Sequence, residues 1–287
     1  MEIQIRIKTP SRWREDLLTP KLKELIPEAI VSKKIKRTTK ILITNYLSVR
    51  EVNRTDKLKY LIIPTSGTEN IPLEFVSMKG IKIIQNKKLI AKNVVIYTRD
   101  MINKLTKKSI RDSLNNKHIL LLGYGVMGQE LYNWLSKYHC SFNILTNKIF
   151  PEADYKEGID FVGPLQELGK VSLKSDIILN TLPKKPDTKD LFKRYNAKLK
   201  EGSLVVNLSR SGILNEREIL LKVKEGIYSG AIFDVYSKDI NEKNYKHPRI
   251  ILTPHIAGIY NNGAKKIAMF IAKEVKRIKK IDSEQIH

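Results

Sequence analysis

HILLLGYGVMG, residues 118–128, is the most informative segment of this 287-residue chain. Its first five residues are too few and too apolar to form anything but a buried strand. The glycines then fit G-x-G-x-x-G: Gly123 allows a tight turn, Gly125 lets backbone approach a pyrophosphate, and Gly128 lets the next helix pack closely. Strand, glycines, helix and second strand follow in this order within about 30 residues, which predicts a dinucleotide-binding unit.

The start of the helix and the end of the second strand in this unit indicate which dinucleotide it binds. The helix after the glycines is expected at residues 129–138, and its N-terminus presents free N–H groups and a partial positive charge to the phosphates. Val126 and Met127, at this end, are expected cofactor contacts. An NAD site usually places an acidic residue about 20 residues after the glycines. This chain has Thr146, Asn147 and Lys148 there. Because no carboxylate repels a 2′-phosphate and Lys148 offers a cation, we expect NADP(H) to be favoured, with NAD(H) as the other cofactor. The alternative is that Lys148 points to solvent.

Short apolar stretches alternate with helical patterns along the whole chain, which predicts parallel sheets with helices on both faces. We therefore expect an α/β fold of two doubly wound parallel-sheet domains. Residues 1–92 and 263–287 would form a flavodoxin-like substrate domain, and residues 93–262 a Rossmann NAD(P)-binding domain. The expected strands are residues 3–7, 41–43, 58–63, 81–84, 118–122, 142–145, 176–179, 204–207, 231–235 and 250–252, and the expected long helices are 93–114 and 262–280.

Composition limits the other possibilities. The 53 basic and 30 acidic residues give a net charge of +23, which suits phosphate-bearing partners. The basic residues are spread along the chain, so we favour a solvated surface and expect no nucleic-acid partner. The chain has no apolar run of membrane-spanning length and no signal-peptide pattern. A single cysteine, Cys140, excludes a disulfide framework and fits the cytoplasm.

Three further motifs carry a resemblance. They are VVNLSRSGILNE (205–216), GAIFDVYSKD (230–239) and ILTPHIAG (251–258). In this order after the glycine loop and DIILNTLPKKPDT (176–188), they resemble the D-isomer-specific 2-hydroxyacid dehydrogenases, the family of glyoxylate/hydroxypyruvate reductases. The resemblance implies an enzyme that interconverts a small 2-oxoacid and its D-2-hydroxyacid by hydride transfer with NAD(P).

The resemblance also implies catalytic residues. Arg210 would bind the substrate's 2-oxo oxygen and carboxylate, a role that suits a planar donor with a permanent charge. His255 would donate a proton during reduction and accept one during oxidation. Counting from Asp234, Asp239 falls where the family has a glutamate that holds the histidine, and it is one methylene shorter. Either the loop moves closer, or Glu242 substitutes, or the pair is weak.

The remaining contacts are also implied by the resemblance. Ser66 and Gly67 would bind the substrate carboxylate through backbone N–H groups, the alternative being an ordinary strand-to-helix turn. Besides the glycine loop and residues 146–148, the expected cofactor contacts are Thr181, Leu182, Pro183, Leu208, Ser209, Asp234 and Gly258.

The chain departs from the family in one segment. Only 26 positions separate Tyr97 from Gly123, so the helical arm that builds the family's dimer is shortened. We expect a compact homodimer, with a monomer as the alternative. Two other functions stay open: a non-catalytic dinucleotide-binding regulator with an acidic or nucleic-acid partner, and a relative using formate or phosphite as hydride donor. The acidic Asp239 argues against the formate enzymes, which pair the histidine with glutamine.

Overall fold

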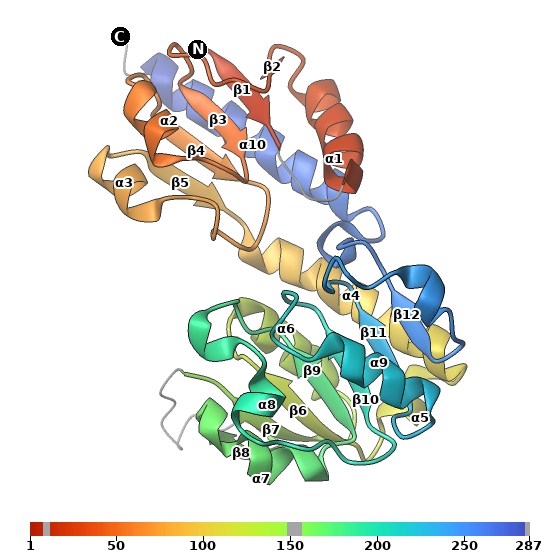
Figure 1. Cartoon of the computed structure of the whole chain (residues 1–287). Helices are drawn as coiled ribbons and strands as arrows, with labels where there is room; N and C mark the ends of the chain where they lie inside the picture. Colours follow the sequence, from red (N-terminus) through yellow and green to blue (C-terminus); the bar gives the residue numbers. More distant parts are fainter. Residues whose placement is uncertain (8–11, 148–156, 285–287) are drawn as a thin grey trace. The chain divides into compact units, whose positions relative to one another are not determined.

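The chain folds into two compact α/β units, as the alternating pattern predicted (Figure 1). The computed structural model describes residues 1–7, 12–147 and 157–284. Unit 1 comprises Met1–Asn93 and Gly258–His287, and unit 2 comprises Val94–Ala257. The expected domain boundaries were 92/93 and 262/263.

Unit 1 contains a five-stranded parallel sheet with helices on both faces. In spatial order its strands are β2 (Ile30–Val31), β1 (Ile3–Arg6), β3 (Ile41–Thr44), β4 (Tyr60–Ile63) and β5 (Lys82–Gln85). Its helices are α1 (Arg12–Leu25), α2 (Val49–Arg54), α3 (Leu73–Met78) and α10 (Gly263–Glu284). Successive strand residues point to opposite faces, and both faces are apolar: Leu42 packs in one core with Val52 and Val76, while Ile41 and Ile43 are buried on the other face. Helices must therefore cover both faces.

Unit 2 contains a seven-stranded parallel sheet. In spatial order its strands are β12 (Ile250–Leu252), β11 (Gly230–Phe233), β10 (Leu204–Asn207), β9 (Ile177–Asn180), β6 (His118–Leu122), β7 (Ser141–Leu145) and β8 (Ile159–Gly163). Numbered from β6, this order is the 3-2-1-4-5-6 of the Rossmann fold with a seventh strand added. Strand β8 was not among the predicted strands. In such sheets ligands bind at the carboxyl ends of the strands, where the order reverses between β6 and β9.

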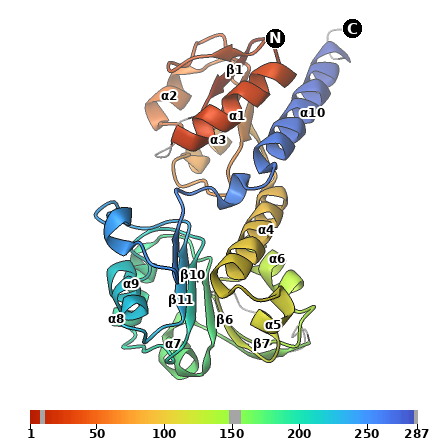
Figure 2. The ribbon, with the colours of Figure 1, turned by 90° about the vertical axis from the view of Figure 1, so that its right-hand side faces the viewer.

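Helices cover both faces of the second sheet as well. They are α4 (Lys87–Thr106), which begins in unit 1, α5 (Ile110–Leu114), α6 (Val126–Leu135), α7 (Leu168–Val171), α8 (Leu191–Arg194) and α9 (Glu216–Lys224). Figure 2 shows α8 and α9 on one face and α5 and α6 on the other. Within the described residues, no helix combines the length and the apolar character needed to span a membrane.

The helices before the glycine loop differ from their predicted bounds. The sequence predicted one helix at residues 93–114, but the structure has α4 followed by the separate α5. Asn86 precedes α4, and its side-chain oxygen accepts the Leu89 N–H at 2.9 Å, which is the contact of a helix N-cap. Lys107 adopts a left-handed φ of +55°, and Ser109 caps α5. The ends of α4 and α5 are therefore determined by helix caps and a turn, which the periodicity of apolar residues does not predict.

A partly buried ion pair joins β1 to α2 in unit 1. Arg6 is 8% exposed, and its guanidinium donates to both carboxylate oxygens of Glu51 and, at 2.6 Å, to the Tyr46 carbonyl. Burial alone would raise the pKa of Glu51. Hydrogen bonds from Arg6 and Ser48 outweigh burial and lower the pKa to about 2. The charged form of Glu51 is therefore favoured in the folded state.

We expect Glu51→Gln to lower the free energy of unfolding of unit 1 by about 3 kcal/mol at neutral pH. The wild-type advantage is complete above the ordinary pKa of 4.5 and is lost as the pH falls towards 2, because the unfolded chain takes up its proton first. Hydrogen exchange of the β1 and β3 amides at several pH values measures this difference for unit 1 alone. A difference that stays constant down to pH 2 would contradict the assignment.

Candidate active site

The glycine loop joins β6 to α6. Gly123 has a φ of +94°, a conformation that favours glycine. A Cβ at Gly128 would lie 2.2 Å from the Gly123 carbonyl oxygen, so α6 packs closer to the loop than a side chain allows. A Cβ at Gly125 would meet no protein atom within 4 Å. The loop thus combines a tight turn, a close helix contact and an open approach to the backbone, which fits a dinucleotide pyrophosphate.

The first turn of α6 offers hydrogen-bond donors to that pyrophosphate. Gly125 caps the helix with an extended backbone, and its carbonyl accepts the Gln129 N–H at 2.9 Å. The N–H groups of Val126 and Met127 precede this bond and have no acceptor within the helix. Since the positive end of the helix dipole lies here, these donors suit phosphate oxygens. Residues 123–128 would therefore hold the diphosphate of a nicotinamide dinucleotide.

The carboxyl end of β7 is where the cofactor ribose is expected. Thr146 is buried, and its N–H donates to the Gly163 carbonyl at 2.9 Å. The Asn147 side-chain amide donates to the Asp187 carboxylate at 3.1 Å. Asp187 lies 40 residues further along the chain, so spacing from the glycines could not reveal this carboxylate. Lys148, the expected partner of a 2′-phosphate, lies outside the described residues.

Two buried asparagines end the neighbouring strands β9 and β10. Asn180 donates from Nδ2 to Oδ1 of Asn207 at 3.0 Å, and Asn207 donates to the Val235 carbonyl at 2.9 Å. Their oxygens accept the N–H groups of Leu182 and Ser209, two of the expected cofactor contacts. The pair therefore fixes both loops. The sequence did not indicate this pair, although both strands, IILN and LVVN, end in the same polar residue.

The other expected cofactor residues of these loops lie nearby. Thr181 donates from its hydroxyl to the carbonyls of Leu122 and Gly123, both at 3.0 Å, which ties the β9 loop to the glycine loop. Leu208 is buried and Pro183 is exposed. These contacts bring the ends of β6, β9 and β10 together at one edge of the sheet.

The catalytic candidates follow three neighbouring strands. The last residues of β10, β11 and β12 pair in parallel register. Arg210 comes three residues after β10, Asp234 directly follows β11, and His255 comes three residues after β12. All three therefore lie at the carboxyl edge of the unit 2 sheet, the edge at which open α/β sheets bind ligands.

Asp234 holds the loop that carries His255. Its carboxylate is 2% exposed and accepts the Thr253 hydroxyl and the Ile256 N–H, each at 2.7 Å, and the Ala257 N–H at 2.9 Å. Its backbone carbonyl accepts the His255 N–H at 2.8 Å. The carboxylate expected to contact the cofactor therefore also stabilises the loop of His255 through hydrogen bonds.

The backbone of His255 has an uncommon conformation. Its φ is +59°, in the left-handed region that residues other than glycine adopt infrequently. Such conformations persist where surrounding contacts impose them, often at functional sites. A buried tyrosine of α4, Tyr97, supplies a further contact through a 2.6 Å hydrogen bond between its hydroxyl and that of Thr253. The loop is thus held from two sides.

A buried carboxylate supports the loop that carries Arg210. Arg210 is half-buried and donates to the Ser209 carbonyl at 2.9 Å. Gly212 turns the chain with a φ of +76°, and its N–H donates to Glu216 at 2.7 Å. Burial raises the pKa of Glu216, which is 5% exposed. The start of α9 therefore anchors the turn after Arg210.

The carboxylate expected to orient the imidazole lies in a surface ion pair. Asp239 contacts Arg217 at 3.0 Å, and both side chains are more than half exposed. Glu242, the alternative, accepts a hydrogen bond from the Tyr236 hydroxyl. Neither of these contacts involves His255.

The substrate-binding candidates of unit 1 lie in the loop after β4. Ser66 and Gly67 are half-buried, and within the described part of the chain their backbone N–H groups make no hydrogen bond. Two donors are therefore available at the carboxyl edge of this sheet. Gly258, an expected cofactor contact, also falls in unit 1, where its carbonyl accepts the Asn93 side-chain amide at 2.9 Å.

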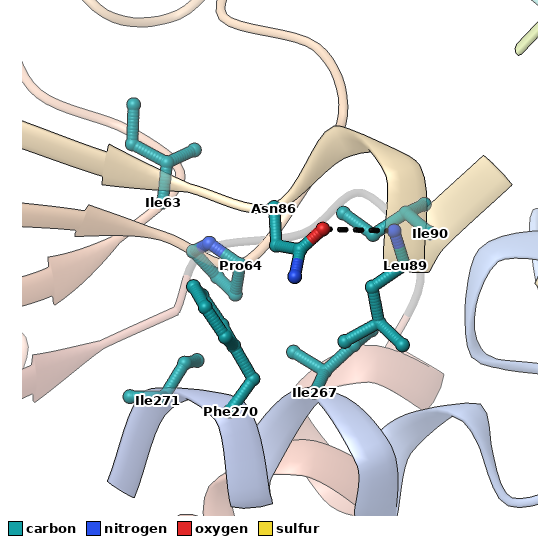
Figure 3. A pocket seen from close by; sticks show the side chains of 8 residues that line it. All are labelled: Ile63, Pro64, Asn86, Leu89, Ile90, Ile267, Phe270 and Ile271. Atoms are coloured by element: carbon teal, nitrogen blue, oxygen red, sulfur yellow. Dashed lines mark hydrogen bonds between the residues drawn. The ribbon is translucent and has the colours of Figure 1, made fainter. Parts of the chain in front are cut away.

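Neither of two hollows adds to the candidate active site. A cavity of about 10 Å³ in unit 1 has room for about one water molecule. Figure 3 shows its lining side chains beside the Asn86 cap of α4. Its lining residues are Ile63, Pro64, Asn86, Leu89, Ile90, Ile267, Phe270 and Ile271. A groove of about 390 Å³ in unit 2 is lined by Lys117, Asp176 and Ser229 at the amino ends of strands, which is the opposite edge of the sheet.

Comparisons with known proteins agree with this geometry. The family model "D-isomer specific 2-hydroxyacid dehydrogenase, NAD binding domain" matches residues 88–257. Glyoxylate/hydroxypyruvate reductase A of Escherichia fergusonii is 26% identical over 166 residues, which cover 56% of this chain and 51% of that protein. D-3-phosphoglycerate dehydrogenase of Bacillus subtilis is 23% identical over 243 residues, which cover 78% of this chain and 46% of that protein. The chain thus matches about half the length of these curated relatives.

Solved structures share the fold of the whole chain. One is the crystal structure of D-lactate dehydrogenase from Aquifex aeolicus complexed with NAD and lactic acid. It is similar with a TM-score of 0.71 and 18% sequence identity, covering 99% of this chain and 97% of that one. At this identity the likeness establishes the two-unit fold.

Proposed function

Because the chain belongs to the D-isomer-specific 2-hydroxyacid dehydrogenase family, we propose that it is an NAD(P)-dependent oxidoreductase that interconverts a small 2-oxoacid and its D-2-hydroxyacid. One observation carries the proposal: Arg210 and His255 follow β10 and β12, the parallel strands on either side of β11, at the ligand-binding edge of the sheet that carries the glycine loop. A protein that only bound the dinucleotide would have no physical need for both side chains there.

The residues divide the chemistry between them. In the reducing direction a hydride adds to C2 of the 2-oxoacid and a proton to its carbonyl oxygen. When bound, the dinucleotide supplies the hydride. Arg210 stabilises the negative charge that develops on the carbonyl oxygen. His255 donates the proton and takes it back in the oxidising direction.

Two further roles complete the proposal. The N–H groups of Ser66 and Gly67 bind the substrate carboxylate. Asp239 is our candidate for the carboxylate that orients His255, and this role requires it to leave Arg217, its partner in the present structure.

The test is the oxidation of NADH and NADPH with a panel of 2-oxoacids that includes glyoxylate, hydroxypyruvate and pyruvate. We expect turnover with at least one of them. Formate and phosphite with NAD and NADP belong in the same panel, since turnover with them alone would favour the other hydride donors. Dinucleotide binding without turnover on any compound would contradict the proposal.

The distribution of charge favours one second candidate function, a dinucleotide-binding regulator with a nucleic-acid or acidic partner. Unit 1 carries 27 basic and 12 acidic residues, a net charge of +15, whereas unit 2 carries 26 and 18, a net charge of +8. Binding of double-stranded DNA that weakens steeply with salt, together with a lack of turnover, would support this function.

The cofactor preference gives a prediction. We propose that Lys148 favours the 2′-phosphate of NADP(H) and that Asp187 opposes it. Asp187→Asn should then raise kcat/KM for NADPH relative to NADH about fivefold, because it removes one exposed negative charge. The effect should diminish at high salt. Asp56→Asn makes the same charge change on the surface of unit 1 and should leave the ratio unchanged. A ratio equal in all three proteins would contradict the role of Asp187.

Assembly and compartment are part of the same proposal. We propose a compact homodimer through the helix that remains where the family builds its longer arm, with a monomer as the alternative, and sedimentation can distinguish the two. We also propose a cytoplasmic location. The free thiol of Cys140 is buried, and burial raises its pKa to about 11, which keeps it protonated and unreactive.

A further inference from the structure

A glutamine at the end of β5 donates hydrogen bonds to the loop that carries Ser66 and Gly67. Gln85 is the last residue of β5 and pairs in register with Ile63, the last residue of β4. Its Nε2 lies 2.5 Å from the carbonyl oxygen of Thr65 and 3.1 Å from that of Ser66. Since both partners are acceptors, the NH₂ end of the amide must face them. One side chain therefore holds two consecutive peptide groups.

The geometry of the two peptide groups then determines where the N–H groups of Ser66 and Gly67 point. The described peptide bonds are all trans, and in a trans peptide the C=O and the next N–H point in opposite directions. The Thr65 carbonyl shares a peptide with the Ser66 N–H, and the Ser66 carbonyl shares one with the Gly67 N–H. Because both carbonyls point to the Gln85 amide, both N–H groups point away from it, to a common side.

The rest of the loop is anchored by other contacts. The Thr65 hydroxyl donates to the Gly67 carbonyl at 3.0 Å, and the Leu47 N–H donates to the Asn70 carbonyl at 2.9 Å. Among the described hydrogen bonds, only those from Gln85 reach the carbonyls of Thr65 and Ser66. Removing the amide should therefore release these two peptides while the loop stays attached at its flanks.

We propose that Gln85 is a positioning residue that aims the N–H groups of Ser66 and Gly67 at the carboxylate of the 2-oxoacid. This role rests on the function proposed above. Gln85 affects only the binding of the substrate carboxylate and should not affect hydride or proton transfer. A substrate without that negative charge should therefore be insensitive to Gln85.

The experiment compares Gln85→Met and Gln85→Glu with the wild type on two substrates, the best 2-oxoacid of the panel and its neutral methyl ester. We expect KM for the acid to rise about tenfold or more, with kcat changed less than about threefold, because two donors to a charged group lose their aim. KM for the ester and for the dinucleotide should stay unchanged. Gln166→Met, at an exposed glutamine of unit 2, is the matched control.

The Gln85→Glu variant adds a pH profile. An ionised carboxylate cannot donate to the two carbonyls, but a protonated carboxyl can donate to one of them. The defect of this variant should therefore shrink as the pH falls, whereas that of Gln85→Met should not. This profile tests whether hydrogen bonds to the two carbonyls cause the defect, and the comparison of acid with ester separates positioning from a merely structural role.

Three results would overturn the proposal. Equal loss on acid and ester would make Gln85 a structural residue, and an unchanged KM for the acid in both variants would remove its role in binding. Both results presuppose an active wild type and leave the proposed function intact. A wild type that reduces no 2-oxoacid would instead overturn the proposed function and this role with it.

Discussion

Replacing His255 by asparagine should lower kcat for 2-oxoacid reduction by about 10²- to 10⁴-fold, the range expected for loss of a positioned general acid. The Kd for NADH or NADPH should change less than about twofold, because the donors that we propose for the phosphates belong to residues 123–128. Asparagine is the informative substitution. His255 has a φ of +59°, and asparagine tolerates left-handed backbone better than other residues with a Cβ. The loop should therefore keep its shape while the proton donor is lost.

Arg210→Lys is the companion variant. Lysine keeps the positive charge but lacks the planar, two-pronged donor geometry, so we expect kcat/KM for the 2-oxoacid to fall about 10²- to 10³-fold. Steady-state kinetics gives the turnover, and the fluorescence of bound NADH gives the cofactor affinity. Turnover within tenfold of wild type in either variant would remove that residue from the chemistry. A parallel loss of cofactor affinity would indicate that the loops, not the reaction, had been damaged.

The features that the sequence predicted best depend on local patterns. A five-residue apolar strand, three glycines at fixed spacing and a helix within 30 residues can be recognised without knowing the rest of the fold. Gly123 then makes the tight turn and Gly128 the close helix contact that the pattern assigns to them, and the space beside Gly125 is open. The two parallel sheets follow from the same kind of reasoning, since each strand buried on both faces needs helices on both sides.

The features that the sequence did not predict depend on contacts between distant residues. Asn180 meets Asn207, and Gln85 meets Thr65, only because neighbouring strands end at the same edge of a sheet. Asp187 reaches Asn147 from a different loop, so counting residues from the glycines found no carboxylate. The spacing of strands along the sequence determines which residues lie at the same edge of a sheet. Which of their polar side chains form hydrogen bonds depends on the conformations of the loops, which spacing does not determine.

Asp239 is a second example of a contact partner that sequence spacing does not determine. Counting from Asp234 placed it at the family's glutamate position, yet its carboxylate contacts Arg217, 22 residues earlier in the chain. The cofactor contact expected of Asp234 stays a prediction, and the structure shows that its carboxylate also accepts hydrogen bonds from Thr253, Ile256 and Ala257. The role of each carboxylate therefore has to be inferred from its contacts as well as from its position in a motif.

Gly128→Ala should destabilise unit 2 by about 3 kcal/mol or prevent its folding, the upper range for overpacking. The new Cβ would lie 2.2 Å from the Gly123 carbonyl oxygen, a backbone atom that can move only with the whole glycine loop. Hydrogen exchange of the β6 and α6 amides, measured without cofactor, reports the loss for this region directly. Exchange as slow as in the wild type would contradict the close packing of α6.

Gly125→Ala is the matched control, with the same chemical change three residues earlier. Its φ of −76° suits alanine, and the added Cβ would meet no protein atom within 4 Å. Stability should therefore fall by less than about 1 kcal/mol, the range for alanine at a helix N-cap. The Kd for NADH and NADPH should nevertheless rise at least about tenfold, because the methyl group enters the space through which the backbone approaches the pyrophosphate. A variant that is stable and binds the dinucleotide as tightly as wild type would show that the pyrophosphate lies elsewhere. Stability lost at Gly128 and affinity lost at Gly125 would together separate the architectural glycine of the loop from the one that serves the cofactor.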